Sequence, residues 1–383
     1  MSYFKIDQLT PKHSSTLLGV GTISKNCVDA TINLANQYNV SVFLVASRRQ
    51  IEAQEFGGGY CHCWSSEEFS RYIRSKDKKK NIIIARDHGG PWQNDFEIHN
   101  KYSLNQAMES AKRSYQIDIE SGFECIHIDP SVDIFGDPNT DEVLSRAFEL
   151  YEHCWKIAQK LNKKIFFEIG TEKQSGDIGT LDEVEYIFFK IKAFCQKNQL
   201  PLPTFIVIQT GTKVVEMKNV GLVGNSLKGA DALQISALID FCNRNNILLK
   251  QHNTDYLNDE ILSLYPKLGV HSVNVAPEFG TRETLALVDL FNKYKLVLLK
   301  DRFLKLAFDS KKWEKWMQTQ NGVGDYEKSL IAGHYVFSDP RFLEIKIQAQ
   351  SELNGRVQDI DAYLVEEIKK SILRYFRNLS LIR

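Results

Sequence analysis

The stretch IIIARDHGGPWQ, residues 82–93, begins as a continuous apolar run and ends in charged and polar residues. Three isoleucines and an alanine in a row are typical of a strand that is buried on both faces. Arg86, Asp87 and His88 follow directly, and a Gly-Gly-Pro sequence then ends any regular structure. Packing does not require a cation, a carboxylate and an imidazole at the end of a strand, so these residues point to a functional site.

Similar apolar runs recur along the chain and alternate with amphipathic segments. Residues 103–122 and 142–162, for example, carry apolar residues three and four apart, as amphipathic helices do. Nearly all-apolar strands that alternate with helices indicate a parallel sheet covered on both faces. The expected strands are Leu17–Gly21, Val42–Ala46, Ile82–Ala85, Cys125–Asp129, Ile165–Ile169, Phe205–Gln209, Leu248–Gln251 and Ser272–Val275.

Eight strand–helix units within about 280 residues is the period of a (β/α)8 TIM barrel. We therefore predict a TIM barrel over residues 1–295. Residues 296–383 show helical patterns only and are expected to form a C-terminal helical extension packed on the barrel. A doubly wound sheet is the competing fold, but Gly19-Val20-Gly21-Thr22 is too short a match to the GxGxxG turn that such a fold usually carries.

The composition favours a small-molecule substrate. Basic and acidic residues number 48 each, so no overall field favours nucleic acid or an acidic membrane. The seven cysteines form no CxxC pair, as expected of reduced thiols. No signal-peptide pattern and no run of about 18 apolar residues occurs. We expect a cytoplasmic protein that neither binds nucleic acid nor spans a membrane.

Polar residues follow six consecutive predicted strands, from the third to the eighth. The carboxyl ends of the strands meet at one rim of a TIM barrel, where the active site lies. A single strand-end Asp is most often a helix cap, yet six such ends on one rim are better explained by one site. The residues at these ends include Asp87, His88, His127, Asp129, Ser131, Glu168, Glu172, Gln209, Gly211, Thr212, Lys213, His252, Asp255, Asn274, Glu278 and Arg282.

This set of residue types predicts metal-assisted sugar chemistry. His88, His252 and a carboxylate, Glu168 or Glu172, can bind a divalent metal, and these ligands suit zinc. We assign Glu168 to the metal. Such an ion would polarise a sugar carbonyl, and Asp87 beside it would carry a proton. Asp129 and Glu172 are the other candidate catalytic residues.

A phosphate is expected at two backbone turns. The amides of Gly211 and Thr212, and those near Gly280, are candidates to hold it, with Lys213 and Arg282 adding charge. Gln209, Asp255 and Glu278 complete the predicted substrate site together with Arg48 and Arg86.

The chain also resembles the accessory (Z) subunit family of class II tagatose-bisphosphate aldolase. The resemblance covers nearly the whole length. It rests on Phe56-Gly57-Gly58-Gly59-Tyr60, Asp87-His88 with Gly90-Pro91, Gly136-Asp137-Pro138, Ile169-Gly170-Thr171-Glu172, Gln209 with Gly211, and His252 with Thr254-Asp255-Tyr256. It implies a TIM barrel with a helical tail, a role in phosphorylated-ketose metabolism and a separate catalytic subunit as partner.

Two departures affect what this resemblance implies. Class II aldolases, which are more distant relatives, pair an acid with a metal-binding His after the third strand, and Asp87-His88 is similar to that pair. They carry a ligand His after the sixth strand, where this chain has Gln209. Arg48, Arg49 and Arg86 depart from the Z pattern, and they indicate an anionic substrate unless they pair with nearby acids.

The sequence thus leaves three functions open. The first is a metal-dependent class II aldolase-like enzyme, an aldolase or epimerase acting on a phosphorylated or acidic ketose. The alternative is a non-catalytic subunit that stabilises a tagatose-bisphosphate-type aldolase. Sugar binding without turnover is a third, which does not require the Asp–His pair. A homo-oligomer is a further expectation.

Overall fold

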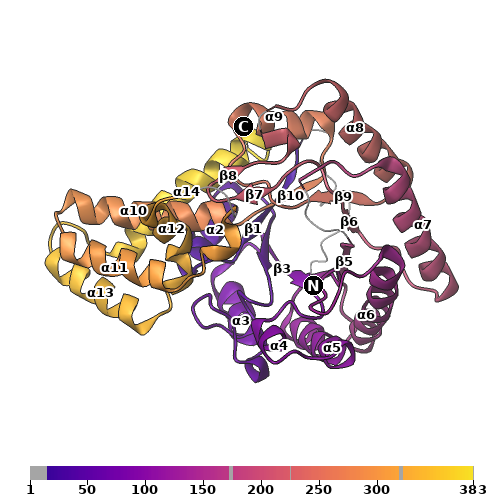
Figure 1. Ribbon diagram of the computed structural model, residues 1–383, viewed down its shortest axis with the longest axis horizontal. Helices are drawn as coiled ribbons and strands as arrows, with labels where there is room; N and C mark the ends of the chain where they lie inside the picture. Colours follow the sequence, from indigo (N-terminus) through magenta and orange to yellow (C-terminus); the bar gives the residue numbers. More distant parts are fainter. Residues whose placement is uncertain (1–14, 172–175, 225, 319–321, 383) are drawn as a thin grey trace.

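A computed structural model describes residues 15–171, 176–224, 226–318 and 322–382 of the chain (Figure 1). Eight parallel strands close into a barrel in the order β1-β10-β9-β6-β5-β4-β3-β2. The predicted (β/α)8 TIM barrel is therefore confirmed. The barrel strands are β1 (Leu17–Gly21), β2 (Val42–Ala46), β3 (Ile82–Gly89), β4 (Cys125–Ile128), β5 (Phe166–Ile169), β6 (Phe205–Val207), β9 (Leu248–Gln251) and β10 (Ser272–Val275), and a short antiparallel hairpin of β7 (Val214–Val215) and β8 (Lys218–Asn219) follows β6.

Helices surround the barrel and begin where the sequence provides caps. Ser103 and Gln106 exchange hydrogen bonds across the first turn of α5, and Asn139 and Glu142 do the same at α6. Such bonds satisfy backbone N–H groups that have no partner within the helix. The helices between the strands are α2 (Lys25–Tyr38), α3 (Ser66–Lys76), α4 (Asp95–His99), α5 (Leu104–Ser121), α6 (Thr140–Lys160), α7 (Leu181–Lys197), α8 (Gly229–Arg244) and α9 (Asp259–Leu268).

The core has two layers. Inside the barrel, Phe43 and Phe205 meet edge to face with ring centroids 5.8 Å apart, among other apolar side chains that point inward from the strands. A larger cluster lies between the strands and the surrounding helices. This is the alternation of inward and outward side chains that a closed parallel barrel requires.

The C-terminal helices form a second apolar cluster beside the barrel. Helices α10 (Pro277–Lys293), α11 (Val297–Asp309), α12 (Asp325–Ala332) and α13 (Pro340–Glu352) contribute most of it, together with the 3-10 helix η4 (Gly333–Val336). A further 3-10 helix, η3 (Glu314–Trp316), lies between α11 and α12 along the chain.

The last helix, α14 (Ile360–Asn378), returns to the barrel. It packs against α2, α9 and α10, and Ile368, Ile372 and Phe376 belong to the barrel's own apolar cluster (Figure 1). After it, the carbonyl of Leu379 accepts a hydrogen bond of 3.0 Å from the amide of Thr16, just before β1. Helix α14 thus covers the barrel between the helices that follow β9 and β1. The domain boundary at residue 295 stays a prediction.

A buried polar cluster joins α2, α10 and α14. The Glu283 carboxyl of α10 accepts hydrogen bonds from the Ser24 hydroxyl and from Asn26 Nδ2, the latter at 2.9 Å. Asn26 Nδ2 also lies 3.1 Å from Asp361 Oδ1 of α14, which pairs with Lys346 at 2.8 Å. Burial raises the pKa of Glu283 to about 7.

Within the described ranges, no helix is long and apolar enough to cross a membrane.

The raised pKa of Glu283 predicts a pH-dependent stability. Because the folded pKa lies above the ordinary value of 4.5, the stabilisation from the protonated carboxyl is complete below about pH 4.5 and is lost as the pH rises through 7. Glu283→Gln keeps the carbonyl acceptor and removes the titration. We expect the difference in unfolding free energy between pH 5 and pH 8 to be smaller in this variant by roughly 2–3 kcal/mol.

Urea denaturation at the two pH values measures this difference. Glu109→Gln, at an exposed glutamate of α5, is the matched control and should behave as the wild type. An unchanged pH dependence in Glu283→Gln would contradict the assignment.

Candidate active site

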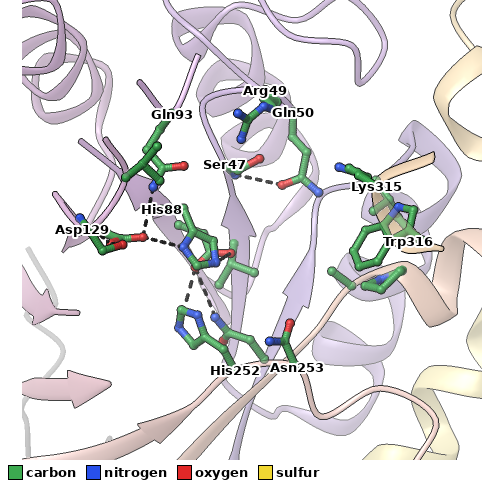
Figure 2. A pocket seen from close by; sticks show the side chains of 18 of the residues that line it. Ser47, Arg49, Gln50, His88, Gln93, Asp129, His252, Asn253, Lys315 and Trp316 are labelled. Carbon is green, nitrogen blue, oxygen red and sulfur yellow. Dashed lines mark hydrogen bonds and ion pairs between the residues drawn. The ribbon is translucent and has the colours of Figure 1, made fainter. Parts of the chain in front are cut away.

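A cavity of about 520 Å³ opens at the carboxyl ends of the barrel strands. Asp87, His88, Asp129 and His252 line it, as do residues that lie between β2 and α3 and others from η3 and η4. Figure 2 shows His88, Asp129 and Gln93 on one side of this cavity and Lys315 and Trp316 on the other. Its size is that of an ordinary small-molecule site.

Three imidazoles surround the Asp87 carboxylate at one end of the cavity. Asp87 Oδ1 lies 3.6 Å from His127 Nδ1 and 3.8 Å from His252 Nε2, and Asp87 Oδ2 lies 3.9 Å from His88 Nε2. One candidate ligand atom from each of the four residues lies within 4.8 Å of the others. Asn274 Nδ2 also approaches Asp87 Oδ1, at 3.4 Å.

A local irregularity in β3 brings Asp87 and His88 to the same place. Neighbouring residues of a regular strand point to opposite faces. Between Arg86 and Gly89 the register of β3 against β4 shifts, and His88 takes a left-handed backbone conformation with φ 44°. A bulge of this kind redirects side chains at the end of a strand. It allows two adjacent residues to face one cavity.

Close packing around His127 depends on a glycine. A Cβ atom on Gly170 would lie 2.4 Å from His127 Nε2, so an alanine there would displace the imidazole. His127 Nδ1 accepts a hydrogen bond of 3.1 Å from the His88 amide. Its Nε2 is buried and has no hydrogen-bond partner among the described residues.

The Asp129 carboxylate orients the His88 imidazole from the side away from Asp87. Asp129 Oδ2 lies 2.7 Å from His88 Nδ1 and also accepts a bond of 3.1 Å from Gln93 Nε2. Burial opposes ionisation of Asp129, but the bond with His88 holds its pKa at about 2. Since Nδ1 of His88 is engaged in this way, its Nε2 is left to face Asp87 and the cavity.

Glu168 contacts His252 at Nε2, the same nitrogen that faces Asp87. Its Oε1 lies 2.9 Å from His252 Nε2, and its Oε2 accepts a bond of 2.6 Å from Lys250 Nζ inside the barrel. Both Glu168 and Lys250 are buried to 1% exposure. Burial opposes ionisation of Glu168, but the Lys250 ammonium keeps its pKa well below the usual range.

The donor set fits a divalent metal ion. The cluster holds three carboxylates and one ammonium group, those of Asp87, Asp129, Glu168 and Lys250. Its net charge is therefore −2 when the imidazoles are neutral, and a divalent cation would balance that charge. Imidazole nitrogen and carboxylate oxygen are zinc ligands at about 2.0–2.2 Å, hence about 3.3 Å from each other in a tetrahedral site. The candidate ligand atoms of Asp87 and the three imidazoles lie within 4.8 Å of one another, and the Asp87 oxygens lie 3.6–3.9 Å from the imidazole nitrogens, so Asp87 would lie beside an ion that the imidazoles hold.

His88 would offer its Nε2 to the ion, with Asp129 orienting the ring from behind. His252 would offer the Nε2 that contacts Glu168, and His127 the Nδ1 that accepts the His88 amide, so both contacts would give way to the ion.

Most of the predicted acid–base and metal residues meet at this end of the cavity. Asp87, His88, Asp129 and His252 line it, while Glu168 contacts His252 Nε2 from within the barrel. Asp255 also lines the cavity, where its Oδ1 accepts the amides of Ala276 and Glu278, both at 2.9 Å. Burial raises the pKa of Asp255 to about 7. Glu172 lies outside the described residues.

Arg48 and Arg86 do not reach the cavity. Arg86 makes two bonds of 2.7 Å to Asp118 of α5, and Arg48 pairs with Glu52 and Glu97, each at 2.6 Å. All these side chains are buried behind β2 and β3. The structure therefore gives the two arginines a role in buried ion pairs instead of the expected contact with substrate.

The two expected phosphate turns are also occupied by protein contacts. The amide of Gly211 donates to the Asp177 carbonyl at 2.9 Å, and the Thr212 hydroxyl donates to the His252 carbonyl at 2.8 Å. Gln209 lines a separate cavity beside α7, and Lys213 is not among the described residues that line the first cavity.

The second turn lies inside α10. Helix α10 begins at Pro277, so Gly280 is within its first turns, and a Cβ there would lie 2.6 Å from the His334 ring. Arg282 is exposed on α10. Glu278 is buried and accepts bonds from the Tyr256 amide at 2.6 Å and the Tyr375 hydroxyl at 2.5 Å. Glu278 thus anchors α10 to α14, and none of Glu278, Gly280 and Arg282 is among the described residues that line the cavity.

Lys250 and Lys315 were not among the sequence candidates, and His127 and Arg49 were noted in the sequence without an assigned role in the site. His127 precedes Asp129 by two positions, and the period of a strand places both on one face, so a signal existed for it. Lys250 follows two leucines within β9, where a charge has no place unless it is paired. Arg49 adjoins Arg48 in the sequence, and only the geometry of the turn shows that Arg49 points to the cavity while Arg48 points to buried acids. No pattern in the sequence around Lys315 indicates that this residue lies at the barrel.

Comparison with known proteins supports the fold. The sequence matches a family model described as "D-tagatose-1,6-bisphosphate aldolase subunit GatZ/KbaZ-like" over residues 6–362. No curated protein matches it. Among solved structures, a probable tagatose 6 phosphate kinase from Sinorhizobium meliloti 1021 is similar with a TM-score of 0.76 at 15% identity, over 95% of this chain and 100% of that one.

Two further structures share the fold at low identity. A fructuronate-tagaturonate epimerase from Cohnella laeviribosi has a TM-score of 0.59 at 10% identity, over 98% of this chain and 84% of that one. The fructose-bisphosphate aldolase of Campylobacter jejuni has a TM-score of 0.57 at 13% identity, over 98% and 93%.

The geometry predicts that His127, and not Gln209, contributes to metal binding. We expect His127→Ala to weaken binding of zinc by at least about 10-fold, because it removes one of three imidazole ligands. Gln209→Ala should bind zinc as the wild type does. Competition with a chromophoric chelator measures the affinity.

His153→Ala, at a half-buried histidine of α6 outside the cavity, is the matched control. The assignment fails if His127→Ala keeps the wild-type affinity or if Gln209→Ala loses as much.

Proposed function

The chain belongs to the GatZ/KbaZ-like family of D-tagatose-1,6-bisphosphate aldolase subunits, and on that premise we propose that it is itself a metal-dependent enzyme of the class II aldolase type. It acts on a phosphorylated or acidic ketose by retro-aldol or enolisation chemistry, as an aldolase or an epimerase. The observation that carries this proposal is the Asp87 carboxylate among three imidazoles at the end of the cavity. Carbohydrate binding alone does not need that arrangement.

The metal centre supplies one part of the chemistry. A divalent ion held there, zinc by the nature of its ligands, would supply a Lewis acid for the carbonyl of a ketose. His88, His127 and His252 are the proposed ligands. Asp129 keeps His88 in place through the bond at 2.7 Å.

Asp87 is the proposed proton carrier. The neighbouring imidazoles hold its pKa well below the usual range in spite of its burial, so it enters the reaction as a carboxylate. It accepts the proton of a substrate hydroxyl when the adjacent carbon–carbon bond breaks, or a proton from carbon in enolisation. The amide of Asn274 holds one of its oxygens at 3.4 Å and leaves the other to face the cavity.

A proton-exchange experiment tests this role. The wild type should catalyse exchange of a carbon-bound proton of a ketose with solvent deuterium, and Asp87→Asn should lose at least about 100-fold of that rate while it still binds zinc. Proton NMR in deuterium oxide, with phosphorylated ketoses and ketouronates as substrates, measures the exchange. Asp141→Asn, at an exposed carboxylate of α6, is the control. Equal exchange by Asp87→Asn would remove the residue from its role.

A non-catalytic subunit is the second candidate function. Family membership favours it, since the family is described by its aldolase subunits, and so does the position of Gln209 outside the cavity. In that role the chain binds a separate catalytic subunit and stabilises its folded state.

Co-expression separates the two functions. A partner present at about 100 times its dissociation constant adds about 2.7 kcal/mol to the stability of the subunit that it binds. If the chain is a stabilising subunit, a tagatose-bisphosphate aldolase catalytic subunit should unfold at a higher temperature with it. The double variant His88→Ala/His252→Ala should then give the same rise. Differential scanning calorimetry measures the unfolding temperature of the catalytic subunit. If neither the wild-type chain nor the double variant raises it, the stabilising role is excluded.

A further inference from the structure

The helical extension builds one wall of the cavity. Lys315 and Trp316 of η3, with His334 and Tyr335 of η4, line it together with barrel residues that lie more than 200 positions earlier in the chain. Figure 2 shows Lys315 and Trp316 facing the cavity across from the His88 and Asp129 side chains. The cavity is therefore completed by residues that the barrel itself does not supply.

Several contacts fix this wall in place. Trp316 Nε1 donates to the Tyr335 hydroxyl at 3.1 Å, and the Trp316 carbonyl accepts the amide of Glu216 at 2.8 Å. The Tyr335 ring packs on Tyr60 with centroids 4.8 Å apart, and the Tyr60 carbonyl accepts the Ser338 hydroxyl at 2.9 Å. These bonds join the extension to the loops that follow β2 and β6. The backbone that carries Lys315 is thus held in place by contacts with the barrel loops.

Lys315 carries a positive charge without a carboxylate to balance it. Its Nζ lies 5.0 Å from the centroids of the Trp316 and Tyr335 rings. In the part of the chain that the structure describes, no carboxylate forms an ion pair with it. The ammonium group thus lies within cation–π range of both rings, which attract its charge without neutralising it and leave its hydrogen-bond donors to a ligand.

Arg49 and Lys312 add to this positive region. Arg49 Nε lies 2.5 Å from Asp95 Oδ1, and Lys312 Nζ lies 3.4 Å from Asp95 Oδ2. Asp95 is thus shared by Arg49 and Lys312. Together with Lys315, the three cations exceed this one carboxylate by two positive charges, although Lys312 is not among the described residues that line the cavity. Arg49 lines the cavity, as Lys315 does, and both side chains are labelled in Figure 2.

The cavity is therefore polarised from end to end. His88, Asp129 and His252 lie on one side of it in Figure 2, and Lys315 and Arg49 lie apart from them. An open-chain sugar with its carbonyl at the carboxylate–imidazole cluster would extend its far end toward the cations. Two excess charges match a phosphate monoester, which carries nearly two negative charges at pH 7, better than a carboxylate, which carries one.

We propose that Lys315 of the helical extension, with Arg49, binds the terminal phosphate of an open-chain ketose whose carbonyl lies at the Asp87 cluster. This proposal rests on the proposed function for the carbonyl end and adds the residues that select the phosphorylated end. It assigns the extension a part in substrate selection. It also replaces the two backbone turns, which protein contacts occupy, as the site of the phosphate.

Binding measurements on the full chain test the proposal. By isothermal titration calorimetry the wild type should bind D-tagatose 6-phosphate more tightly than D-tagatose, since a charge-assisted contact separates the two ligands. Lys315→Met should weaken binding of the phosphorylated sugar by at least about 10-fold and leave binding of D-tagatose unchanged. Lys315→Arg should restore most of the affinity. Lys305→Met, at a lysine of α11 that is 77% exposed, is the matched control and should bind as the wild type.

Each outcome separates this proposal from the proposed catalysis. Equal binding of D-tagatose 6-phosphate by Lys315→Met and the wild type overturns the phosphate site, whether or not proton exchange occurs. Tight, Lys315-dependent binding of D-tagaturonate in place of D-tagatose 6-phosphate overturns the choice of phosphate over carboxylate. Lys315-dependent binding of the phosphorylated sugar without proton exchange supports the phosphate site and removes the catalytic proposal alone.

Discussion

The ion pair between Lys250 and Glu168 inside the barrel is the contact on which the candidate site depends. Lys250 Nζ lies 4.9 and 5.4 Å from the ring centroids of Phe43 and Phe205, so the charge sits directly on the apolar layer of the barrel. Breaking such a pair leaves a buried charge uncompensated, which costs about 3–5 kcal/mol. The second oxygen of Glu168 holds His252, and His252 faces Asp87. The barrel interior and the carboxylate–imidazole cluster are therefore one connected unit.

The fold could be predicted because strand positions depend on local composition. All eight barrel strands lie where short apolar runs alternate with helical patterns, and a closed parallel sheet needs that alternation. Candidate residues at the strand ends, such as Asp87, His88 and His252, could be found by the same reasoning, since parallel strands bring their carboxyl ends to one rim. His127 was within reach as well, because it shares a strand face with Asp129.

The direction of each side chain could not be predicted, because it depends on the irregular backbone beyond the strands. The bulge in β3 turns Asp87 and His88 to the cavity and leaves Arg86 facing the helices, where Asp118 holds it. Arg48 and Arg49 divide in the same way between buried acids and the cavity. Lys315 lies far beyond the barrel in the sequence, so the path of the extension had to be known first.

The return of α14 to the barrel links the site to the order in which the chain is made. The helix packs against α2, and Leu379 bonds to Thr16, so contacts that cover β1 come from residues more than 300 positions later. A ribosome adds about 5–20 residues per second, and the apolar faces of α2 and α9 stay uncovered until α14 emerges. We expect chaperones to meet this protein at those two helices.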